Sequence, residues 1–152
     1  MIRITAVWTL SLLVLSGVPL ADPQPWMVKE NPNDLSVMFS IHTNCPEEDS
    51  SIYPEIVMGV LTRSRIKGTT NRSPTGLFLR ANVRCGLPSS SNSTFLFSLG
   101  VFFGRYTDDG YFTVYYPGYS EFGTTDADTL RISLRERTEY AIIDYLQANF
   151  DL

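Results

Sequence analysis

The sequence predicts an α+β fold: a single domain in which a four-stranded, mostly antiparallel sheet carries two helices on one face. Alternating apolar and polar residues mark four strand-length segments, and two longer segments show helical spacing. The predicted order is strand, helix, three strands, helix. Since the elements are grouped in this way, we expect both helices to cover the same face of the sheet.

Residues 1–21 have the layout of a secretory signal peptide: Arg3, an apolar run, then small and turn-forming residues. The run is shorter than the roughly 20 residues that a membrane-spanning helix needs. We expect cleavage after Ala21, with cleavage after Ser16 or no cleavage as alternatives, and export to the periplasm or the extracellular space. Residues 22–34 contain three prolines and no periodicity, which indicates an extended lead-in to a domain at 35–152.

The first strand and helix are predicted from two patterns. In residues 35–42, every second side chain is apolar, and Ser36, Met38, Ser40 and His42 share the opposite face. Acidic and serine residues then precede Pro54, and apolar residues recur at helical spacing from Tyr53 to Leu61.

The second strand is predicted at 77–85, where alternation resumes, and the two cysteines lie beside the first two strands. Cys45 follows the first strand and Cys85 ends the second. In a parallel crossover these positions meet at one end of the sheet, so we expect a disulfide in the exported chain. Two buried free thiols are the alternative.

The third and fourth strands are predicted at 95–107 and 111–119, joined by a hairpin. Asp109-Gly110 is a strong hairpin signal. If these two residues form the centre of the turn, Phe103 lies opposite Tyr116 and Gly104 opposite Tyr115. Odd-numbered residues of the third strand and even-numbered residues of the fourth then face the helices.

A long helix is predicted at 127–150 from an apolar stripe that begins at Leu130. Thr125 or Asp126 is expected to cap its N-terminus. Arg135 and Glu139 have the spacing of an ion pair on its exposed side.

The face of the sheet away from the helices is the predicted binding surface. It combines arginines, tyrosines and a histidine, residue types that are enriched in interfaces. A merely solvated face, or one covered by the lead-in and Trp26, is the alternative. The predicted contact residues are Arg80, Arg84, Tyr106, Tyr111 and Tyr115.

Few residues suggest catalysis or cofactor binding. His42 is the only histidine, a weak candidate for a general base, and no nucleophile-elbow motif accompanies it. One histidine and two paired cysteines do not make a zinc site, and no phosphate-binding glycine loop occurs, so we expect no metal and no cofactor. The net charge of −4 argues against nucleic acid. Asn92 is a glycan acceptor only if the host glycosylates.

The sequence thus favours an exported, non-catalytic binding or accessory protein that engages a protein, peptide or glycan. A small hydrolase using His42 and a homodimerising envelope module are the alternatives.

Overall fold

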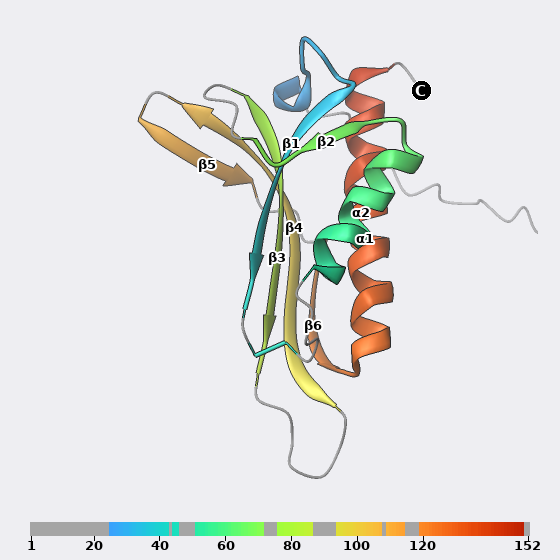
Figure 1. Ribbon diagram of the computed structural model, residues 1–152. Coiled ribbons are helices and arrows are strands. Elements are labelled where there is room, and N and C mark those ends of the chain that lie inside the picture. Colours follow the sequence, from blue (N-terminus) through green and yellow to red (C-terminus); the bar gives the residue numbers. More distant parts are fainter. Residues whose placement is uncertain are drawn as a thin grey trace, which may run out of the picture.

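The protein folds into a mixed six-stranded sheet with two helices packed against one face (Figure 1). The computed structural model describes residues 25–42, 44–45, 51–71, 76–86, 94–107, 109–114 and 119–150. The predicted signal peptide, Asn92 and Tyr115 lie outside these residues. The elements are η1 (Pro25–Met27), β1 (Asp34–Ile41), α1 (Ile52–Arg63), β2 (Lys67–Thr69), β3 (Leu77–Cys85), β4 (Phe95–Thr107), β5 (Gly110–Val114), β6 (Ser120–Thr125) and α2 (Ala127–Asn149).

The strand order confirms the α+β class and the parallel crossover, but not the strand count. The order is β2-β1-β3-β4-β5, and β6 also pairs with β4. β1 is parallel to β2 and β3, whereas β3 and β4 are antiparallel. The prediction of four strands is wrong because β2 and β6 were missed. Both are short edge strands that lack a run of alternating apolar residues.

β4 is long enough for two strands to pair with the same side of it. β5 pairs with Phe103–Thr107, and β6 pairs with Phe95–Gly100. The predicted hairpin register is wrong by two residues, because Thr107 pairs with Gly110 and Phe103 with Val114. Gly110 has a φ of +140°, which favours glycine at this position. Since a shift of two residues preserves side-chain alternation, the predicted faces remain valid for β5. The prediction is wrong for Tyr119, which lies beyond the end of β5 and is buried in the core against Phe103.

The core lies between the helices and the sheet face that β1, β3 and β4 build from odd-numbered residues. The rings of Phe103 and Tyr145 stack there with centroids 5.9 Å apart. Burial raises the pKa of Tyr145, whose hydroxyl donates to the carbonyl of Pro32. Other fully buried members are Leu35, Tyr53, Leu61, Leu77, Leu79, Leu99, Leu130 and Leu134.

α2 begins where the sequence predicts. The Asp126 carboxylate accepts a hydrogen bond from the Thr129 amide at 2.8 Å, and this bond lowers the pKa of Asp126. The helix packs beside α1, and Glu139 pairs with Arg63 of α1 at 3.0 Å. The sequence predicts an ion pair between Glu139 and Arg135 of the same helix, whereas the structure pairs Glu139 with Arg63.

The lead-in packs on the helix side of the sheet. Trp26 lies edge-on to Phe103, with ring centroids 6.4 Å apart. The Arg105 guanidinium donates to the carbonyls of Trp26 and Val28 at 2.8 and 3.2 Å. The described part of the lead-in therefore does not cover the opposite face.

The predicted disulfide is confirmed. Cys45 and Cys85 are bonded, with Cα atoms 4.9 Å apart, and link the chain just after β1 to the end of β3. A disulfide fits the oxidising compartments that exported proteins enter.

Candidate binding face

The sheet face opposite the helices, here called the outer face, carries side chains aligned in rows across the strands. Strand pairing defines each row, because residues directly opposite one another point to the same side. From the β5 end of β4 to the opposite end, the rows are Ser36–Phe78–Gly104, Met38–Arg80–Phe102, Ser40–Asn82–Gly100–Ser120 and Arg84–Ser98–Phe122.

An aromatic cluster closes the part of the outer face near β5. Phe78 is fully buried, with ring centroids 4.8 Å from Tyr106 and 6.0 Å from Tyr111. The Tyr106 hydroxyl lies 3.0 Å from the sulfur of Met38 and donates to it. Tyr106 is buried, whereas Tyr111 is 49% exposed. Phe78, Tyr106 and Tyr111 therefore form a second, smaller packed layer on this part of the face.

The middle row is covered by an aromatic ring from within β4. A Cβ atom on Gly100 would lie 2.3 Å from the Phe102 ring, so the ring rests on the bare backbone of Gly100. The predicted hairpin register, continued along the two strands, puts Tyr119 opposite Gly100, but the partner of Gly100 is Ser120. On either side of Gly100, Asn82 Oδ1 and Ser120 Oγ are buried without a hydrogen-bond partner among the described residues.

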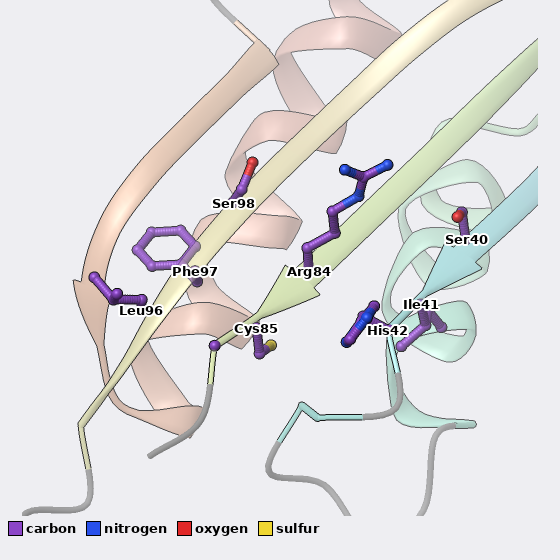
Figure 2. A pocket seen from close by; sticks show the side chains of 9 residues that line it. Ser40, Ile41, His42, Arg84, Cys85, Leu96, Phe97 and Ser98 are labelled. Carbon is purple, nitrogen blue, oxygen red and sulfur yellow. The ribbon is translucent and has the colours of Figure 1, made fainter. Parts of the chain in front are cut away.

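The remaining part of the outer face is open and hollowed. A depression of about 600 Å³ lies at the disulfide end of β1, β3 and β4. Arg84, Ser98 and His42 come from adjacent strands or strand ends, and their side chains lie around this depression (Figure 2). Its other lining residues are Ser40, Ile41, Cys85, Gly86, Leu96 and Phe97.

Two apolar side chains are exposed beside the depression. Leu96 lines it and is 64% exposed, and Phe122 on β6 is 87% exposed. They are diagonal neighbours, because Ser98 pairs with Phe122 and Leu96 with Thr124. Exposed apolar groups beside a guanidinium and hydroxyls are typical of an interaction surface.

The predicted contact residues occupy different parts of this face. Arg84 is exposed in the depression, and Arg80 is half-buried between Met38 and Phe102 in its row. Tyr106 and Tyr111 belong to the aromatic cluster, and Tyr115 is outside the described residues.

Sequence reasoning did not single out Leu96 and Phe122. Leu96 is an even-numbered residue of the predicted strand at 95–107, so alternation alone places it on the outer face. Phe122 lies in a segment, 120–125, that has no alternating apolar pattern and for which the sequence predicts no strand.

The surroundings of His42 do not form a catalytic arrangement within the described residues. Its backbone amide donates to the Val83 carbonyl at 2.8 Å, and its side chain is exposed. No hydrogen bond joins its imidazole to a described serine or carboxylate, and the described lining of the depression contains no Asp or Glu. No cluster of metal-binding side chains occurs in the described part of the chain. Across the same residues, no helix has the length and apolar character needed to span a membrane.

Two solved structures are distant neighbours of this chain. No family model and no curated protein matches the chain. A minor lipoprotein from Acinetobacter baumannii is similar over 78% of this chain and 92% of its own, with 13% identity and a TM-score of 0.38. Rare lipoprotein B from Shewanella oneidensis is similar over 74% and 92%, with 10% identity and a TM-score of 0.32. At these values neither likeness assigns a function.

Proposed function

We propose that this chain is an exported, non-catalytic accessory protein of the cell envelope or exterior that binds a partner at the open half of its outer face. The observation that carries the proposal is the depression of about 600 Å³ on a sheet face that neither helix covers. The disulfide supports the oxidising location.

The chemistry of the depression favours a protein or peptide partner. Arg84 offers a guanidinium that binds a carboxylate through two hydrogen bonds, and Ser40 and Ser98 add hydroxyls. Leu96 provides an apolar contact next to these polar groups. An extended acidic segment with apolar neighbours matches this combination, and a glycan is the alternative that the test separates.

Site-specific crosslinking in the native host tests the proposal. A photoreactive residue at position 98 should give a crosslinked product with a partner of distinct mass, and Arg84→Glu in the same chain should remove it. A photoreactive residue at Arg135, exposed on α2, is the matched control and should give no such product.

Mass spectrometry of the crosslinked product distinguishes a protein from a glycan. Crosslinking at position 98 that survives both Arg84→Glu and Leu96→Ala would overturn the proposal. Equal thermal unfolding of all variants shows that the fold is retained.

A further inference from the structure

β6 presents a free edge within the described residues, and its unpaired backbone groups can be assigned. Gly86 N donates to the Leu96 carbonyl, and Tyr106 N donates to the Gly76 carbonyl, so even-numbered residues of β4 bond to β3. Odd-numbered residues of β4 therefore bond to β6. From the register, the β6 residues whose N–H and C=O groups point away from β4 are Ser120, Phe122 and Thr124.

The side chains on this edge do not protect it from pairing with another strand. Edge strands are commonly protected by charges, by short length or by a covering segment. The opposite edge strand, β2, has three residues and carries the exposed Lys67. On the outer face, by contrast, the side chains of β6 are uncharged, and Phe122 is 87% exposed.

A second exposed apolar feature lies on α2. Ile132, Tyr140 and Ile143 are 52%, 51% and 49% exposed, and their spacing puts them on one helix stripe. The full stripe is Thr129, Ile132, Glu136, Tyr140, Ile143 and Gln147.

Two copies of this stripe complement each other when they pack antiparallel with position 138 at the centre of the contact. In an antiparallel pairing of two copies, Ile132 meets Ile143, Glu136 meets Tyr140 and Thr129 meets Gln147. The contacts bring two apolar side chains together and give the Tyr140 hydroxyl a carboxylate acceptor.

The centres of the two features lie next to each other. Glu121 of β6 accepts from Arg137 of α2 at 3.1 Å, and the Arg137 guanidinium lies 5.8 Å from the centre of the Tyr140 ring. The middle of the β6 edge is Phe122, and the middle of the helix stripe is position 138. A single two-fold axis perpendicular to the sheet can therefore serve both.

We propose that two copies of this chain form a homodimer by pairing β6 with β6 in an antiparallel, continuous sheet. Phe122 then lies opposite Phe122 of the second copy, and Ser120 lies opposite Thr124. Each copy of α2 lies over β6 and β4 of its own chain, and neighbouring strands are about 4.8 Å apart. The two copies of α2 therefore come within about 10 Å of each other, a normal distance between packed helices. The two Phe122 side chains meet on the outer face, and the two copies of α2 meet on the opposite face of the sheet.

The dimer is independent of the partner-binding proposal and adds to it. The depression lies next to Phe122, but its lining residues come from β1, β3, β4 and the residues just after β1 and β3, and none comes from β6. Pairing of β6 with β6 therefore leaves it accessible in both copies. Two depressions on one continuous sheet face would allow bivalent capture of a repetitive or dimeric partner.

Register-specific disulfide trapping tests the proposal on the exported protein as purified from its host. In the proposed pairing, the two Cα atoms of residue 122 are about 5.5 Å apart, within the range that a disulfide bridges. Phe122→Cys should therefore yield a covalent dimer on mild oxidation. Ser120→Cys is the matched control: its two copies are about 14 Å apart and should stay unlinked. Mixing Ser120→Cys with Thr124→Cys should restore crosslinking.

Sedimentation of the unmodified protein supplies the second measurement. A strand pair and a helix pair make a small interface, so we expect dissociation in the micromolar range, seen as a doubling of mass between about 1 and 200 µM. Phe122→Lys and Ile143→Arg lie on opposite sides of the sheet, and each should weaken dimerisation by at least about tenfold. Leu96→Lys should not weaken it.

Three results would overturn the proposal. One is a monomer at every concentration, and another is equal crosslinking of the 120 and 122 cysteine variants. The third is a dimer that Leu96→Lys disrupts and Ile143→Arg does not, which would place the interface on the outer face.

Discussion

Truncation of Phe78 tests whether the outer face contains its own packed layer. Its side chain is on the face away from the helices, yet it is fully buried against Tyr106 and Tyr111. Removing a buried phenylalanine costs about 3–5 kcal/mol of unfolding free energy, from lost burial and the cavity left behind. With a urea m-value of about 2 kcal/mol per M, Phe78→Ala should lower the unfolding midpoint by about 1.5–2.5 M.

Two matched variants give this experiment its controls. Phe78→Leu keeps most of the buried volume, so it should lose less than half as much as Phe78→Ala. Arg84→Ala, an exposed substitution on the same strand and face, should change the unfolding free energy by no more than about 0.5 kcal/mol. If Phe78→Ala costs no more than Arg84→Ala in urea titrations followed by circular dichroism, the closed layer does not exist.

Three further predictions concern the disulfide, the α2 cap and the lead-in. The Cys45–Cys85 bond spans 40 residues, so removing it should lower the unfolding free energy by up to about 4 kcal/mol. Denaturant unfolding of the double variant Cys45→Ser/Cys85→Ser, compared with the oxidised protein, measures this loss. An unchanged denaturant midpoint would contradict the prediction. Because the pKa of Asp126 is lower in the folded state, its stabilisation is complete above its unfolded pKa of about 3.9 and is lost as pH falls through the folded value. Asp126→Asn keeps the cap but should weaken this acid dependence in thermal melts at pH 2–6, whereas an identical pH profile would refute the cap's role. Arg105→Ala removes two hydrogen bonds to lead-in carbonyls and should cost about 1.5–3 kcal/mol, with faster proteolysis at residues 25–33 than in Arg105→Lys; equal proteolysis of both would count against it.

The sequence was sufficient for the strands and helices whose own residues carry a strong pattern. The predicted strands at 77–85 and 95–107 match β3 and β4, and the final helix and its Asp126 cap are found where expected. Alternation also assigned the two faces of β1, β3, β4 and β5 correctly, because successive side chains of a strand must point to opposite sides. That rule holds even where the hairpin register was wrong, since the error was an even number of residues. Alternation failed for Tyr119, which lies outside β5 and is buried in the core.

Tertiary structure decided which residues of the outer face are open. Alternation places Phe78 and Arg84 on the same face, but it cannot show that a tyrosine pair buries the first and leaves the second exposed. The strand β6 was missed for a related reason. β6 is held in the sheet by pairing with the long neighbouring strand β4. Its own residues show no alternating apolar pattern from which a strand could be predicted.

The sequence by itself therefore determined the fold class, the disulfide and the two sides of the sheet, because these follow from local periodicity and from where the cysteines fall along the strands. The open depression and the free β6 edge were decided only in three dimensions. Both depend on contacts between residues far apart in the chain, and such contacts leave no periodic trace in any single segment.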